Sequence, residues 1–132
     1  LISSLGHDVG HFALTNRFCV AARHEVALKY NDASVLENMH ASITFELLTH
    51  KDKDILANLE SADWMFVRRV ILEMILATDM AKHFELLGQF RAKINSGSDH
   101  DLTNADERLF LLRFILKCSD IGHAAKQIDL HE

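Results

Sequence analysis

Apolar residues recur with helical spacing over most of the chain. Between Asp63 and Asp79 they follow an i, i+3, i+4, i+7 rhythm that places them on one helix face. These positions are Val67, Val70, Ile71, Met74, Ile75 and Thr78. A second helix is expected from about Asn104 to Cys118, with one apolar stripe made of Leu111, Phe114, Ile115 and Cys118. Strand-like alternation is essentially missing, so the pattern predicts an all-α fold.

Further helices are expected where apolar periodicity follows a capping signal. Ser34 to Thr49 reads as a third long helix, because Ser34 and Glu37 have the spacing of a capping box. Met80 to Asn95 reads as a fourth, with Phe84, Leu87 and Phe90 facing inward. Shorter helices are predicted at Leu1–Leu5, Arg23–Tyr30 and Lys53–Leu59. Ser61 is a candidate N-cap, as is Thr103 or Asn104, and a polar loop is expected from Asn95 to Asp101.

Size and composition narrow the class of protein. A chain of 132 residues is about one domain long. The net charge of −5 argues against nucleic acid as a partner, because neutralising phosphates requires clustered Lys and Arg. No apolar run approaches the roughly 20 residues of a membrane span. Cys19 and Cys118 are too far apart to suggest a disulfide framework, which favours two buried thiols and a cytoplasmic location.

The ends of the sequence suggest an internal part of a longer protein. Leu1 falls inside an expected helix, and no terminating signal precedes Glu132. We therefore expect a helical bundle truncated at both ends.

Candidate chemistry begins with the adjacent pair His7 and Asp8. A neutral imidazole nitrogen beside a bridging carboxylate suits a site for two divalent cations. Such a pair alone is weak evidence, but it opens the string at 7–16, HDVGHFALTN. Further strings are YND at 30–32, SVLEN at 34–38, LATDM at 76–80 and KCSD at 117–120. Together they resemble the catalytic domain of class I cyclic nucleotide phosphodiesterases, a branch of the HD hydrolase superfamily.

The resemblance implies both a fold and a reaction. Residues 1–132 would be the central part of a single phosphodiesterase catalytic domain, a compact multi-helix bundle. The implied activity is hydrolysis of 3′,5′-cyclic AMP, cyclic GMP or both to nucleoside 5′-monophosphates, by a hydroxide that bridges two metal ions. The implied cofactors are Zn²⁺ together with Mg²⁺ or Mn²⁺. The implied partner is the cyclic nucleotide, and a homodimer of the whole protein is left open.

The resemblance also assigns roles to individual residues. The metal ligands would be His7, Asp8 and Asp120. Asp120 also ends an apolar helix, where a buried carboxylate would need a cation, although an exposed Asp is the simple alternative. Residues that would hydrogen-bond metal-bound water are His11, Glu37, Thr78 and Asp79. A capping box is the alternative for Glu37.

The substrate pocket would include Met80 and His123, with ordinary core packing as the alternative for Met80. Relatives usually have Pro-Gly where this chain has Phe12-Ala13, and their late string continues differently from Ile121–Ala125. The family's general-acid His is expected upstream of His7, so no catalytic residue is assigned within 1–132, and the isolated segment should bind metal weakly. The alternatives are a regulatory or nucleotide-binding pseudoenzyme, another HD-type phosphohydrolase and a plain helical scaffold.

Overall fold

The computed structural model describes residues 1–97 and 101–126, apart from the side chains of His123 and Ala124. The described residues form helices and turns without a strand, which confirms the all-α prediction. The α-helices are α1 (Ile2–Gly6), α2 (Asn16–Ala21), α3 (Glu25–Lys29), α4 (Val35–Leu48), α5 (Ser61–Leu76), α6 (His83–Asn95) and α7 (Ala105–Ile121). Two 3₁₀ turns are η1 (Met80–Lys82) and η2 (Gly122–Ala125).

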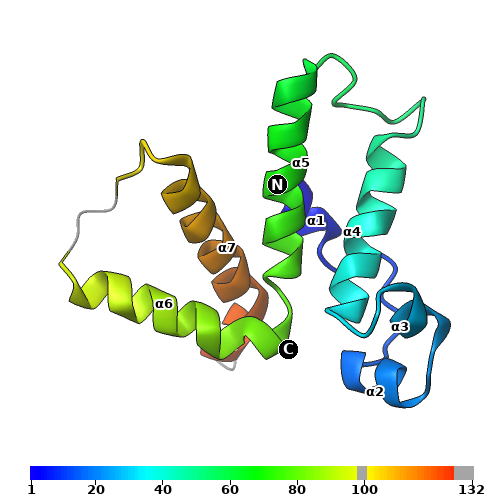
Figure 1. The fold of residues 1–132 in the computed structure, drawn as a ribbon, viewed down its shortest axis with the longest axis horizontal. Coiled ribbons are helices and arrows are strands. Elements are labelled where there is room, and N and C mark those ends of the chain that lie inside the picture. The colour runs from blue at the N-terminus through cyan, green and yellow to red at the C-terminus, as the bar shows by residue number, and fades with distance from the viewer. Residues whose placement is uncertain (98–100, 127–132) are drawn as a thin grey trace.

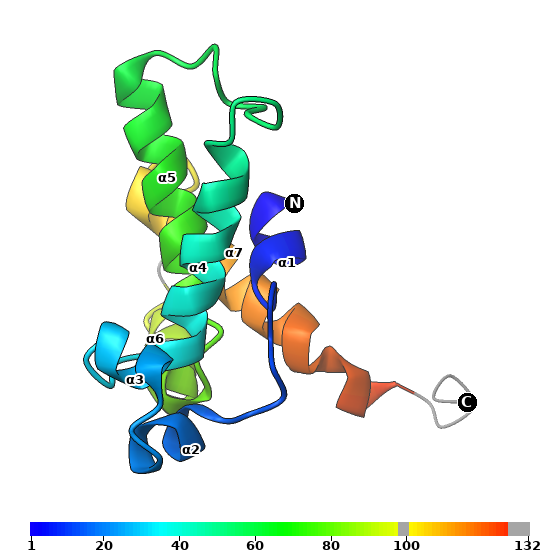
Figure 2. The ribbon, with the colours of Figure 1, turned by 90° about the vertical axis from the view of Figure 1, so that its right-hand side faces the viewer.

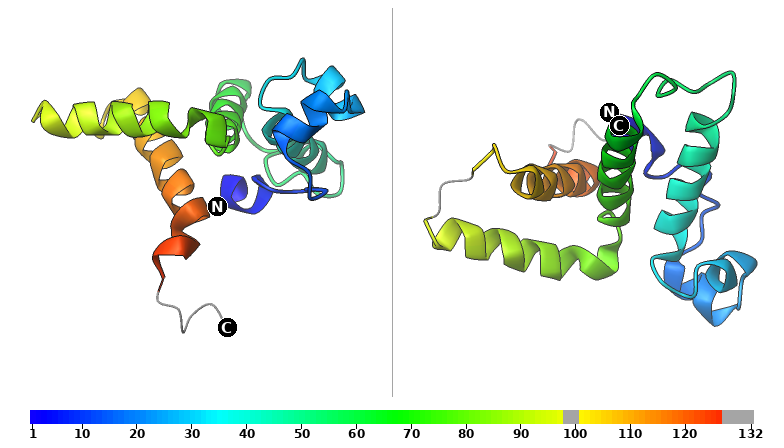
Figure 3. Two further views of the ribbon diagram at one scale, coloured as in Figure 1. Left: turned by 90° about the horizontal axis from the view of Figure 1, so that it is seen from below. Right: turned by 45° about the horizontal axis from the view of Figure 1, so that its top comes forward.

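Helix α5 is the centre of the arrangement. It packs against α4 and α1 on one side and against α7 on the other, and α2 and α3 gather at the start of α4 (Figure 1). Seen from the side, α1 lies beside α4, and α7 passes below α1 (Figure 2). Helix α6 leads away from the end of α5, and α7 returns toward it (Figure 3). None of the described helices is long and apolar enough to span a membrane.

The apolar face predicted for α5 is confirmed by its burial. Ile71, Met74 and Ile75 are buried, and Thr78 is buried just beyond the helix. Ile71 and Ile75 form a core cluster with Ala41 and Phe45 of α4, whereas Met74 packs against Leu109 and Leu116 of α7. Removing this apolar surface from water is the main force that holds α4, α5 and α7 together.

The predicted apolar stripe of α7 is wrong in part. Ile115 and Cys118 are exposed, while Leu109, Phe110 and Leu116 are buried. Apolar residues surround nearly the whole circumference of this helix between 109 and 118, so periodicity alone could not select the side that faces α5. The expectation that both thiols are buried holds only for Cys19.

The predicted capping box at the start of α4 is also wrong. Ser34 adopts a left-handed conformation with φ +42° and makes no cap with its own side chain. Asn16 supplies the cap instead, since its Oδ1 accepts a hydrogen bond from the Leu36 backbone N at 2.8 Å. A residue twenty positions away thus satisfies a free N–H of this helix, which no local motif could reveal.

Several element boundaries differ from the sequence pattern. The segment 53–59 forms turns rather than a helix, and Asp54 Oδ1 there accepts from Leu56 N at 2.9 Å, a local bond that competes with helix formation. Helix α2 was not predicted. The expected helix over 80–95 is divided into η1 and α6, and Phe84 is 80% exposed rather than inward. Asn104 does cap α7, through the backbone N atoms of Asp106 and Glu107.

Candidate metal centre

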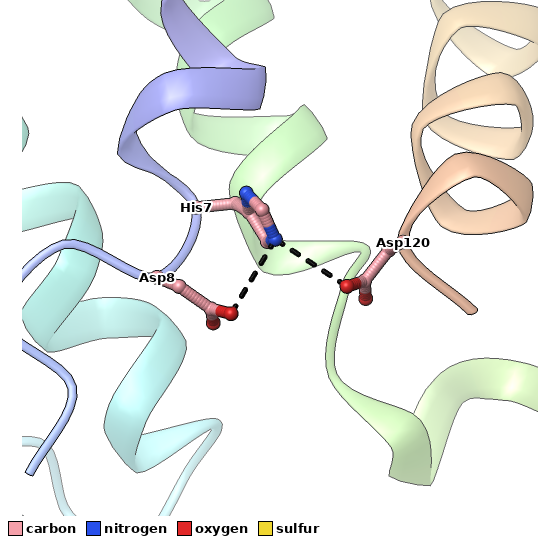
Figure 4. A group of neighbouring side chains, drawn as sticks. All are labelled: His7, Asp8 and Asp120. Atoms are coloured by element: carbon pink, nitrogen blue, oxygen red, sulfur yellow. Dashed lines mark ion pairs between the residues drawn. The ribbon is translucent and has the colours of Figure 1, made fainter. Parts of the chain in front are cut away.

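The three predicted metal ligands lie together between α1 and α7 (Figure 4). His7 follows the end of α1, Asp8 is the next residue, and Asp120 lies in the last turn of α7. His7 Nε2 is 3.5 Å from Asp8 Oδ2 and 3.3 Å from Asp120 Oδ1. One ligand atom from each residue lies within 4.8 Å of the other two. The fold therefore brings Asp120 close to His7 and Asp8, from which it is more than 110 residues distant in the sequence.

The hydrogen bonding of His7 favours a cation at this point. Its Nδ1 is 2.9 Å from the Ser4 carbonyl oxygen, which can only accept, so Nδ1 carries a proton. In the neutral ring, the Nε2 lone pair then faces two carboxylates. Three electron-rich atoms converge, and only a cation, either a proton on the ring or a metal ion, makes this arrangement favourable. A histidine and two carboxylates, with the second ring nitrogen held by a carbonyl, form a donor set that fits a divalent metal.

Close packing of the 6–10 segment against α4 positions His7 and Asp8. A Cβ on Gly6 would lie 2.4 Å from Thr44 Oγ1, so only glycine allows this approach of α1 to α4. The Thr44 hydroxyl donates to the Gly6 carbonyl at 3.3 Å. Gly10 has φ +74°, which L side chains rarely adopt. Beside it, the fully buried His40 donates from Nδ1 to the Val9 carbonyl at 2.8 Å and places Nε2 3.8 Å from Asp8 Oδ1.

Glu37 and Asp79 lie nearby but are engaged by protein donors. Asn16 Nδ2 donates to Glu37 Oε2 at 2.9 Å. Asp79 accepts from the Ser34 hydroxyl at one oxygen and from Ala81 N at the other, each at 2.8 Å. These contacts tie α2, α4 and η1 together. That Glu37 and Asp79 also hydrogen-bond metal-bound water stays a prediction.

Thr78 and His11 have different surroundings. The buried Thr78 hydroxyl donates to the Ile75 carbonyl at 2.7 Å. His11 is exposed, and its Nδ1 accepts from Ala13 N at 3.0 Å, so a neutral ring carries its proton on Nε2. The Nε2–H of such a ring is a donor suited to water or a phosphate oxygen, and the ring stacks on His40, with centroids 5.6 Å apart.

A cavity of about 440 Å³ lies beside His11 and Asp79. His11, Asn16, Leu36, Asp79 and Met80 are among its lining residues. Met80 is 57% exposed, so core packing does not explain it, and its role in a substrate pocket stays a prediction. The second predicted pocket residue, His123, has a side chain outside the described part of the structure.

Sequence reasoning missed the burial of Lys117. It used this residue only as part of the string that ends at Asp120, whereas the structure buries its side chain to 2% exposure. The available signal was its position, a cation within an apolar helix and one turn before the predicted ligand.

Comparison with known proteins identifies the family of this chain. The family model described as 3′5′-cyclic nucleotide phosphodiesterase matches residues 1–132. The dual 3′,5′-cyclic-AMP and -GMP phosphodiesterase beta of Plasmodium falciparum is 41% identical over 94% of this chain. The 3′,5′-cyclic-nucleotide phosphodiesterase regA of Dictyostelium discoideum is 40% identical over 96%.

A solved structure shows the same fold. The crystal structure of the phosphodiesterase domain of Salpingoeca rosetta rhodopsin phosphodiesterase superposes with a TM-score of 0.94 and 39% identity over 98% of this chain. The chain spans only 40% of that solved chain, and 11% and 16% of the Plasmodium and Dictyostelium proteins. With a family match over its whole length and relatives at about 40% identity, the chain belongs to the 3′,5′-cyclic nucleotide phosphodiesterase family.

Proposed function

We propose that residues 1–132 form part of the catalytic domain of a metal-dependent phosphodiesterase that hydrolyses cyclic AMP, cyclic GMP or both. The observation that carries the proposal is the convergence of His7, Asp8 and Asp120 in a chain of this family. The three residues would hold divalent cations, with Zn²⁺ and either Mg²⁺ or Mn²⁺ as the proposed pair. The cytoplasmic location and the homodimer stay predictions.

The proposed reaction opens the cyclic phosphate. Water adds to phosphorus, the bond to the 3′ oxygen breaks, and a nucleoside 5′-monophosphate results. Bound divalent cations would supply hydroxide at neutral pH and offset negative charge on the phosphoryl oxygens. His7 offers Nε2 because Ser4 holds Nδ1, while Asp8 and Asp120 contribute the negative charge that retains the cations. His11 lines the cavity and, with Nδ1 accepting from Ala13 N, has an Nε2–H that would orient water or phosphate.

The test is hydrolysis of cyclic AMP and cyclic GMP by the full-length protein and its Asp120→Ala variant, with Mg²⁺ and Zn²⁺ present. We expect kcat/KM to fall at least ~100-fold, which corresponds to a few kcal/mol of transition-state stabilisation. Asp106→Ala is the matched control, since it removes a 77% exposed carboxylate at the opposite end of the same helix. Near-normal turnover in Asp120→Ala would refute the ligand assignment. A folded, metal-loaded wild type that hydrolyses neither nucleotide would refute the proposed activity.

A further inference from the structure

Lys117 is a buried cation whose position the predicted ligand set does not explain. It lies in α7 between Leu116, which packs on α5, and the exposed Cys118. Its side chain is 2% exposed. Burying an ammonium group is costly unless hydrogen bonds and opposite charges compensate, so a lysine here calls for a specific reason.

The hydrogen bond of Lys117 joins the ends of two helices. Its Nζ donates to the carbonyl oxygen of Thr78, two residues beyond the end of α5. Among the described residues, this bond is the buried polar link from α5 to the last turns of α7. The carbonyl is itself buried, so losing the donor would leave an unsatisfied acceptor in the interior.

Three carboxylates act electrostatically on this ammonium. Burial lowers the pKa of Lys117, and Asp120, Asp79 and Glu37, in that order of strength, act against the shift. Asp120 lies three residues further along α7, so the two side chains share one face of the helix. Asp79, which precedes η1, accepts a hydrogen bond from Ser34, and Glu37 of α4 accepts one from Asn16.

The gap between His7 and Asp120 depends on how α7 lies on α5. His7 follows α1, which packs on α4 and α5, whereas Asp120 is carried by α7. The Met74 and Leu116 contact sets the apolar spacing of α5 and α7, but dispersion contacts of this kind are not directional. The Lys117 bond is directional, and it lies within one turn of Asp120.

We propose that Lys117 is a positioning residue for the metal centre, fastening α7 to the Thr78 carbonyl so that Asp120 stays opposite His7 and Asp8. The inference rests on the proposed function only in that the centre binds divalent cations. It makes a prediction opposite in sign to simple electrostatics. A positive charge near the ligands repels a metal ion, so charge alone would make its removal tighten binding, whereas loss of positioning weakens binding.

The test is calorimetric titration of the metal-stripped, full-length protein with Mn²⁺ and, separately, Zn²⁺. We expect Lys117→Met, which keeps a similar length but lacks donor and charge, to raise the Kd for the cation at least tenfold. Lys117→Arg should stay within about threefold of wild type, because it retains a cationic donor. Arg69→Met is the matched control, since Arg69 links α5 to the opposite end of α7 through Asp106, and it should leave the Kd unchanged.

A folded Lys117→Met protein that binds cations as tightly as wild type, or more tightly, overturns the proposal. Should this variant fail to fold, Lys117→Gln takes its place under the same criterion. The cation Kd separates the two proposals. A wild type that binds Mn²⁺ without hydrolysing cyclic nucleotides defeats the proposed function while still testing Lys117. An active wild type whose Lys117→Met variant keeps its Kd defeats only the positioning role.

Discussion

The carboxylates of Glu37 and Asp79 are stabilised in a different way from those of Asp8 and Asp120. Glu37 and Asp79 accept hydrogen bonds from Asn16, Ser34 and a backbone N–H. In the described part of the chain, the side chains paired with Asp8 and Asp120 within 4 Å are histidine rings. The first pair is therefore satisfied by the fold, whereas the second pair has acceptor capacity to spare.

This difference indicates which acidic residues serve the fold and which serve a ligand. A buried carboxylate with protein donors stabilises the native state, and removing it should cost stability. A carboxylate directed at a histidine lone pair and another carboxylate contributes little to the fold, and its removal should affect ligand binding instead. Removing Glu37 or Asp79 should therefore lower stability, whereas removing Asp8 or Asp120 should lower ligand binding and leave stability nearly unchanged.

The largest expected effect is that of Asp8→Asn. The variant removes the negative charge between His7 and His40 while retaining the shape of the side chain. We expect cyclic nucleotide hydrolysis by the full-length protein to fall at least ~100-fold, because a proposed metal ligand is lost. The midpoint of thermal unfolding without added metal should stay near that of wild type, since the side chain is 65% exposed. Unchanged hydrolysis would move Asp8 out of the ligand set.

Asp79→Ala should show the reverse behaviour, a large loss of stability. Two hydrogen bonds to a carboxylate that is 6% exposed are removed, and Ser34 loses its acceptor. We expect the free energy of unfolding to fall by about 2–4 kcal/mol, measured by urea denaturation. Ser34→Ala should cost less, because the bond from Ala81 N survives. A loss below about 0.5 kcal/mol would show that the Asp79 contacts do not stabilise the fold.

Gly6→Ala tests the packing that delivers His7 to the site. The added Cβ would lie 2.4 Å from Thr44 Oγ1 and 3.1 Å from Thr44 Cγ2, so α1 must move away from α4. We expect a loss of about 1–3 kcal/mol in unfolding free energy, typical of overpacking. Adding Thr44→Ala, which removes both atoms, should recover part of the loss, so the two changes are not additive. Full additivity would indicate that the steric contact is not the cause.

The sequence was sufficient for some of these features because their signals are local or have a distinctive order. The periodicity of 63–79 specifies the buried face of α5, and Asn104 followed by Asp106 and Glu107 marks the start of α7. His7, Asp8 and Asp120 could be selected only through family strings, because a His-Asp pair alone is too common to be informative. Their proximity then follows from the fold.

Other features depend on contacts between distant segments, which no local pattern contains. Asn16 caps α4 from twenty positions away, so the local capping-box signal at Ser34 was misleading. Which side of α7 is buried depends on where α5 lies. The burial of the Lys117 ammonium depends on the Thr78 carbonyl, a distant acceptor that the local sequence does not reveal. The segment 53–59 lacks Pro and Gly, yet the hydrogen bond that the Asp54 carboxylate accepts from Leu56 N favours turns over a helix.

Asn16→Asp refines the comparison between the two carboxylate pairs. Aspartate keeps an oxygen that can accept from Leu36 N, but it replaces the donor that faces Glu37 with a second negative charge. We expect a loss of about 1–2 kcal/mol in unfolding free energy from the lost bond and the repulsion. Asn16→Ala removes both the cap of Leu36 N and the donor to Glu37, so we expect a larger loss of about 2–3 kcal/mol. Stability of Asn16→Asp equal to wild type would mean that Glu37 does not need its protein donor.

The smallest expected effect is that of Arg69→Met at the exposed end of the α5 and α7 contact. Arg69 donates to Glu73 and Asp106, each at 2.9 Å, and these hydrogen bonds raise the pKa of its guanidinium. Both partners also have water available, and Asp106 is 77% exposed, so the fold does not depend on this cation. We expect the thermal midpoint to fall by less than about 2 °C, and 0.5 M NaCl to remove most of the difference by screening. A larger, salt-independent loss would show that a surface cation fixes the geometry of these helices, a role that we propose for the buried Lys117.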